Sequence, residues 1–136
     1  MFENPSEDQI RDLLRRVKSI AVVGYSPKPE RPGHYVAKAL QDYGYRIIPV
    51  RPGIGEGLGE KAYPRVADLP ETPDMVDVFR EPSAVEAIVD DCIVRGVKNL
   101  WLQDGVINEA AARRAQAAGI TVVMDRCTLR DQGLLV

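Results

Sequence analysis

The sequence predicts an α/β fold, a single doubly wound domain around a five-stranded parallel sheet. Five short runs rich in apolar and β-branched residues recur along the chain, and apolar residues at helical spacing lie between most of them. A glycine directly follows the first run, and a helical pattern starts soon after it. This arrangement is typical of the first strand–turn–helix unit of a nucleotide-binding sheet.

The length of the chain fits one compact domain. With 136 residues, 45% of them hydrophobic, we expect one domain over residues 1–136, with an N-terminal helix within residues 1–18 and a C-terminal tail at 125–136. The helix is predicted from about Ser6 to Val17, because Ser6 and Gln9 have the spacing of a capping box. Apolar residues at positions 10, 13, 14 and 17 then give it one buried stripe.

The first strand is predicted at Ile20–Val23, and it stops at Gly24. Pro32 suits the first position of the following helix, whose apolar residues at 36, 39, 40 and 43 share one face. Gly44 ends that helix. In such a unit, free backbone N–H groups and the positive end of the helix dipole bind a phosphate. An anionic, nucleotide-like ligand is therefore the leading hypothesis.

A second strand at Tyr45–Val50 leads into a long connection, Arg51–Asp74. It carries four glycines, at 53, 55, 57 and 59, and at most one helical turn, near Val66–Leu69. Connections of this length are often functional or mobile, but a plain surface loop is also tolerated, because loop length costs little free energy. Both interpretations stay open at this point.

The rest of the chain repeats the strand–helix pattern. Further strands are expected at residues 75–79, 98–102 and 120–124. Helices are expected from about residue 85 to Gly96 and from Asn108 to Gly119. Right-handed crossovers then give a Rossmann-like sheet, most simply ordered 3-2-1-4-5. In such sheets ligands bind beyond the carboxyl ends of the strands, near the switch point between strands one and four.

Basic residues lie beyond four of the five predicted strand ends, although the net charge is only -2. These residues are Lys28 and Arg31, Arg51, Arg80, and Arg126, with Gln103 after the remaining strand. A polyanion site explains this placement, and ordinary solvated charge is the alternative. The low net charge itself gives no basic field that would favour a nucleic-acid partner.

The local motifs limit which nucleotide the site could bind. The G-x-G-x-x-G fingerprint and the Walker A motif are both absent. Arg51 stands where a typical NAD site has an acidic residue, and arginine there could pair with a ribose phosphate. CoA and NADP both carry such a phosphate, so the local pattern leaves both open.

Several other polar and reactive residues carry a structural interpretation. The single histidine, His34, is expected to be solvated, and Trp101 to lie in the core. Asp77 is expected on an edge strand, where its side chain reaches solvent unless it pairs with a nearby cation. Cys92 and Cys127 form no metal-like cluster and are expected to be reduced thiols. With no signal-like N-terminus and no long apolar run, we expect a cytoplasmic protein without a membrane partner.

Taken together, these motifs resemble the family of small stand-alone CoA-binding proteins. The resemblance rests on IAVVGYSPKPERPGHYV, YRIIPVRPG, DMVDVFR, LWLQDGVINEAA and VVMDRC, and it covers about residues 6–127. Members have a single Rossmann-like domain similar to the CoA-binding domain of the succinyl-CoA synthetase alpha subunit. The resemblance implies that CoA or an acyl-CoA is the ligand.

The resemblance also implies a set of site residues. The phosphate loop would be lined by Gly24, Tyr25, Ser26 and Arg31, beside the basic Lys28. The adenosine end would be formed by Val50, Arg51 and Pro52. The rest of the pocket would be bordered by Val78, Phe79, Arg80, Gln103 and Gly105.

Two differences from the family limit which of its properties can be expected of this chain. Many relatives have Asn-Pro where this chain has Arg51-Pro52, and the synthetase's phosphohistidine belongs to a further domain. A non-catalytic CoA carrier or sensor is the favoured function, because one histidine and two scattered cysteines supply little catalytic material. The alternatives are an NADP-dependent or acyl-CoA-utilising enzyme and a regulatory subunit with a vestigial pocket. A protein partner is not identified by the sequence.

Overall fold

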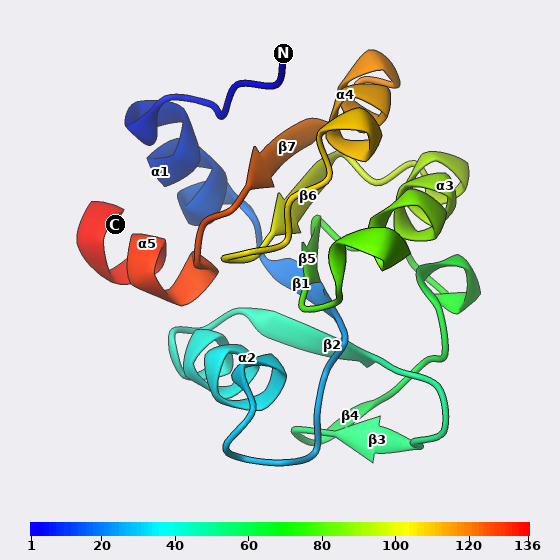
Figure 1. Ribbon diagram of the computed structural model, residues 1–136. Helices are drawn as coiled ribbons and strands as arrows, with labels where there is room; N and C mark the ends of the chain where they lie inside the picture. Colours follow the sequence, from blue (N-terminus) through cyan, green and yellow to red (C-terminus); the bar gives the residue numbers. More distant parts are fainter.

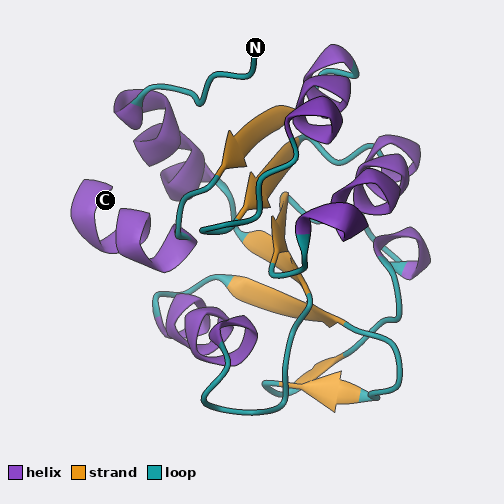
Figure 2. Ribbon diagram, viewed as in Figure 1, coloured by secondary structure: helices purple, strands orange, loops and turns teal.

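The computed structural model describes residues 1–136 as a parallel sheet between two layers of helices (Figures 1 and 2). The main strands are β1 (Ser19–Val23), β2 (Arg46–Val50), β5 (Met75–Val78), β6 (Asn99–Leu102) and β7 (Thr121–Met124). The helices are α1 (Glu7–Arg16), α2 (Pro32–Asp42), α3 (Val85–Arg95), α4 (Glu109–Ala117) and α5 (Thr128–Leu135). The predicted fold class is confirmed.

The strand order is β2-β1-β5-β6-β7, and every neighbouring pair is parallel. It differs from the expected 3-2-1-4-5 in one respect, since the third main strand, β5, lies beside β1 instead of outside β2. The outer edge of β2 holds Pro49, which has no N–H to donate, and Tyr63 of the long connection pairs there instead. The crevice at the switch of strand order therefore lies between β1 and β5.

The two faces of the sheet bury separate clusters of apolar side chains. One face packs against α1, α2 and α5, and the other packs against α3 and α4. Trp101 is fully buried, as expected, and its indole N–H donates to the carbonyl of Arg126 over 2.7 Å. Each face is covered because a parallel sheet must bury both of its apolar sides.

The ends of the chain are fixed more firmly than the sequence indicated. At the start, the predicted capping box of Ser6 and Gln9 is present. The side chain of Asn4 exchanges two hydrogen bonds with the backbone of Met124 and so caps the edge of β7. At the other end, the predicted C-terminal tail at 125–136 contains α5, which lies against α1 (Figure 1).

The long connection after β2 is partly ordered by hydrogen bonds. It contains a short antiparallel hairpin, β3 (Glu56–Gly57) and β4 (Glu60–Lys61), followed by the 3₁₀ turn η1 (Val66–Asp68). The helical turn was expected, and the hairpin was not. Among the helices of the chain, none is both long and apolar enough to cross a bilayer.

Candidate functional site

A cavity of about 810 Å³ opens beyond the carboxyl ends of β1, β2 and β5. Its walls come from the loop after β1, the start of α2, the residues that follow β2 and β5, the turn η1 and one face of α3. Its position is the one at which ligands bind in doubly wound sheets, and its size is that of a small-molecule site.

Gly24 lines the cavity and lets the ends of β1, β2 and β5 pack closely together there. Its N–H donates to the carbonyl of Val50 over 3.1 Å, which ties the turn to β2. With φ at +87°, Gly24 also lies so close to Phe79 that an added Cβ would stand 2.5 Å from the Phe79 carbonyl oxygen. Gly33, in the first turn of α2, lies in the same way against the Gly24 carbonyl. Two glycines thus let the end of β1, the end of β5 and the start of α2 approach closely.

The loop and the helix start present unpaired backbone donors. The N–H groups of Tyr25, Ser26 and Gly33 have no acceptor within the protein. No side chain caps the N-terminus of α2, whose N-cap residue is Arg31. N–H groups at the positive end of a helix dipole are a favourable environment for a phosphate or another anion.

Two side chains shape this loop. Ser26 Oγ accepts a hydrogen bond from the N–H of Lys28 at 3.1 Å, which stiffens the turn and leaves the Ser26 hydroxyl proton able to donate to a ligand. His34 Nδ1 lies 2.9 Å from the Ser26 carbonyl oxygen, to which it must donate. The expectation that His34 is simply solvated was therefore incomplete, because its ring holds the loop.

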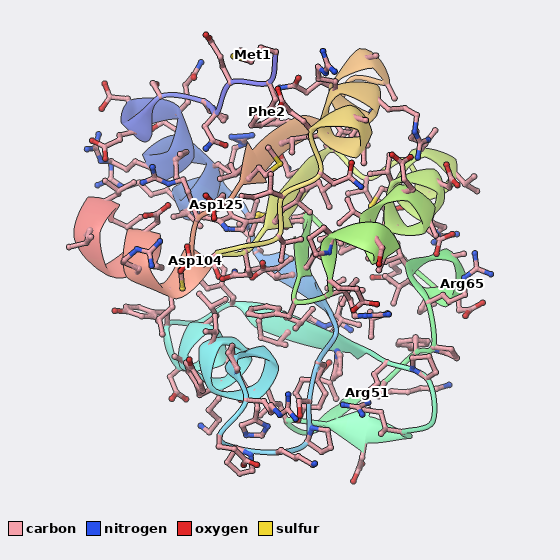
Figure 3. All side chains as sticks on the ribbon, viewed as in Figure 1. Met1, Phe2, Arg51, Arg65, Asp104 and Asp125 are labelled. Carbon is pink, nitrogen blue, oxygen red and sulfur yellow. The ribbon has the colours of Figure 1, made fainter.

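The basic residues around the cavity differ in how far carboxylates offset them. Arg80 pairs with Glu81 at 2.9 Å, and this contact lowers the pKa of the Glu81 carboxyl. Arg65 pairs with Asp91 at 2.7 Å. Figure 3 shows Arg51 at the end of β2 and Arg65 beside η1, in separate parts of the wall.

The remaining cations of the wall have no carboxylate partner. These are Lys28, Arg31 and Arg51. Arg51 Nη1 donates to the Tyr25 carbonyl at 3.3 Å, which links the residue after β2 to the loop after β1. The unpaired positive charge is therefore concentrated beside the free N–H groups.

Ten of the thirteen residues predicted for the site line the cavity. They are Gly24, Tyr25, Ser26, Lys28, Arg31, Val50, Arg51, Pro52, Phe79 and Arg80. Three lie outside it. Val78 is buried inside β5. The Gln103 amide donates to the side chains of Asp77 and Thr128, and the Gly105 N–H donates to Asp125.

The physical reason for this difference is the strand order. Gln103 and Gly105 follow β6, which lies one strand beyond the crevice between β1 and β5. Arg126, after β7, is farther still, and it pairs with Asp131 at 2.6 Å. In Figure 3, Asp104 and Asp125 lie near α5, well away from Arg51, and neither of them lines the cavity.

Sequence reasoning missed one wall of the cavity. It is formed by Pro64, Arg65, Val66, Ala84, Ala87, Ile88 and Asp91. The apolar spacing along α3 predicts only a core stripe, although Ile88 faces both the core and the cavity. Asp91 and Arg65 are 26 positions apart, so no local pattern reveals that they meet.

Asp77 lies in a different environment from the one expected. It is in a central strand, is fully buried, and accepts hydrogen bonds from Gln103 Nε2 at 2.7 Å and from Thr128 Oγ1 at 2.9 Å. Burial raises its pKa to about 7, although both hydrogen bonds act to lower it. The group joins β5, the residue after β6 and the first residue of α5.

Comparison with known proteins identifies the family. The CoA binding domain family matches residues 18–132. The chain belongs to this family. An uncharacterised protein of Bacillus subtilis strain 168, YneT, is 41% identical over 126 residues, which are 93% of each chain. A hypothetical protein from Pyrococcus horikoshii OT3, whose structure is solved, is 38% identical, with a TM-score of 0.92 over 99% of both chains.

The same domain occurs within larger proteins. The alpha subunit of acetate–CoA ligase [ADP-forming] I of Pyrococcus furiosus is 36% identical over 93 residues. That match covers 64% of this chain and only 20% of the ligase subunit. The resemblance to stand-alone CoA-binding proteins is confirmed, and the match to the alpha subunit of an ADP-forming acetate–CoA ligase agrees with the expected likeness to a synthetase alpha subunit.

Proposed function

We propose that the protein binds CoA or an acyl-CoA as a non-catalytic carrier or sensor. One observation carries the proposal: in a chain of the CoA-binding family, three unpaired N–H groups at the start of α2 and in the loop before it lie at a cavity with unpaired cations. A diphosphate bound there would accept these hydrogen bonds and lie at the positive end of the helix dipole.

The three unpaired cations would divide between the diphosphate of the ligand and its 3′-phosphate. Lys28 and Arg31 flank the helix start and would neutralise the diphosphate. Arg51 follows β2, where such folds place the ribose, and would pair with the ribose 3′-phosphate that distinguishes CoA from dephospho-CoA. This assignment favours CoA over NAD, whose ribose carries no phosphate there.

The reactive side chains support a binding role over a catalytic one. Cys92 is fully buried, and burial raises the pKa of its thiol to about 12, so the thiol stays protonated at neutral pH. Cys127 packs against the core on the face of α1, α2 and α5 and does not line the cavity. His34 uses Nδ1 to hold the Ser26 carbonyl. A cytoplasmic location and the absence of a nucleic-acid partner stay predictions.

Isothermal titration with CoA tests the proposal. Arg31→Ala and Arg51→Ala should each weaken binding by about tenfold or more, since a charge-assisted hydrogen bond contributes about 1.5–3 kcal/mol. Arg113→Ala, on the exposed side of α4, is the matched control and should bind as the wild type does. Unchanged affinity in both cavity variants would contradict the assignment of the phosphate site.

A further inference from the structure

Gly57 of the β3–β4 hairpin lies directly against the ring of Tyr25. A Cβ at position 57 would stand 2.5 Å from Cε2 of that ring, 2.6 Å from Cζ and 2.8 Å from the hydroxyl oxygen. Such distances require either the ring or the hairpin backbone to move. Gly57 itself does not line the cavity, and its backbone has no left-handed φ that would by itself demand glycine. The close approach to Tyr25 is therefore the feature that a side chain at position 57 would disturb.

Tyr25 is the first residue of the anion-binding loop after Gly24. The residue is only 2% exposed, so its ring has little free space into which it could shift. Its carbonyl accepts from Arg51, its N–H is one of the unpaired donors, and Ser26 follows it. Moving the ring would therefore move donors and a cation of the phosphate site together.

The hairpin has anchors of its own on α2 and β2. Gln41 Nε2, on α2, donates to the Leu58 carbonyl at 2.8 Å, and Tyr63 pairs with the edge of β2. Leu58 sits at a φ of +52°, which costs a non-glycine residue free energy and persists only where the surroundings enforce it. Figure 1 shows the hairpin beside the loop that runs from β1 to α2.

We infer that Gly57 is a positioning residue for the anion-binding loop and that the hairpin supports this loop from behind through the Tyr25 ring. The inference rests on the proposed function for its ligand. It assigns the glycine-rich part of the long connection a fixed supporting role, in contrast to a segment that closes over the bound nucleotide. The size of the side chain at position 57 then controls the affinity for CoA, although that residue does not contact CoA.

The test compares Gly57→Ala with Gly55→Ala by calorimetric titration with CoA. Gly55 lies in the same hairpin region, but a Cβ there would meet nothing within 4 Å. Gly57→Ala should weaken CoA binding by about tenfold, and Gly55→Ala should leave it unchanged. In a Tyr25→Leu background, which removes the ring, adding Gly57→Ala should change affinity by less than about twofold.

A second measurement needs no ligand. The Lys28 N–H bonds to Ser26 Oγ, so its hydrogen-exchange rate reports the geometry of the loop. Exchange at Lys28 should be faster in Gly57→Ala than in the wild type and unchanged in Gly55→Ala.

Two results would overturn the inference. One is equal CoA affinity in Gly57→Ala and the wild type, and the other is an equal loss of affinity from Gly57→Ala with and without the Tyr25→Leu substitution. If the wild type binds no CoA, the proposed function fails, and unaltered exchange at Lys28 in Gly57→Ala would show separately that the inference fails.

Discussion

The carboxyl of Asp77 should make the free energy of unfolding fall as pH rises. Folded-state burial raises its pKa from 3.8 to about 7. Between these two values the folded protein holds a proton that the unfolded chain has released, so raising the pH favours unfolding. The stabilisation is fully present below about pH 4 and is lost as pH approaches about 7, and the full difference corresponds to about 4 kcal/mol.

Asp77→Asn imitates the protonated acid in size and charge. In this variant the side-chain oxygen can still accept from Gln103, and the amide nitrogen can donate to the Thr128 hydroxyl oxygen. The variant should therefore lack this pH dependence. The unfolding free energy of the variant minus that of the wild type should therefore rise by about 3 kcal/mol as the pH increases from about 5 to about 8.

Urea unfolding at several pH values measures this difference directly. Asp12→Asn, which removes an exposed carboxylate on α1, is the matched control and should leave the pH profile unaltered. If the difference in unfolding free energy between Asp77→Asn and wild type stays constant from about pH 5 to about pH 8, Asp77 does not titrate with a raised pKa, and the reasoning is refuted.

Three further substitutions test other parts of the account. Gly33→Ala should weaken CoA binding in calorimetry, because its Cβ would push α2 away from the Gly24 carbonyl, whereas Gly133→Ala in α5 has room for a methyl group and should bind normally. Ser6→Ala should lower the free energy of unfolding by about 1 kcal/mol in urea, through loss of the helix cap. Asp91→Ala should lower it by about 1–3 kcal/mol, because η1 loses its anchor on α3, and an unchanged urea midpoint would argue against that anchor.

The sequence predicted those features that depend on neighbouring residues. The capping box of Ser6, the glycine end of β1 and the left-handed Gly96 after α3 are all local, and each follows from spacing or residue type. The cavity residues directly after β1 and β2 were predicted for a related reason. Parallel strands that share a direction place their carboxyl ends at one edge of the sheet, so those positions follow from the topology.

Long-range neighbours were harder to predict. The expected order placed β5 outside β2, but β2 is an edge strand and β5 pairs with β1. Pro49 within β2 indicated an edge strand, because proline cannot donate to a neighbouring strand, and this signal was not used. That one difference moved Asp77 from an edge to the centre of the sheet, and it left Gln103 and Gly105 away from the cavity. The α3 wall was missed because a helical stripe that lines a cavity has the same spacing as one that lines a core.

The proposed CoA site is best tested by calorimetric titration of the purified protein with CoA, dephospho-CoA and NADP in one buffer at one salt concentration. CoA should bind, loss of its 3′-phosphate should weaken binding by about tenfold or more, and NADP should bind more weakly than CoA. Native mass spectrometry beforehand establishes whether the protein was purified with ligand already bound. Equal affinity for CoA and dephospho-CoA would contradict the role of Arg51, and tighter binding of NADP than of CoA by the ligand-free protein would contradict the proposed function itself.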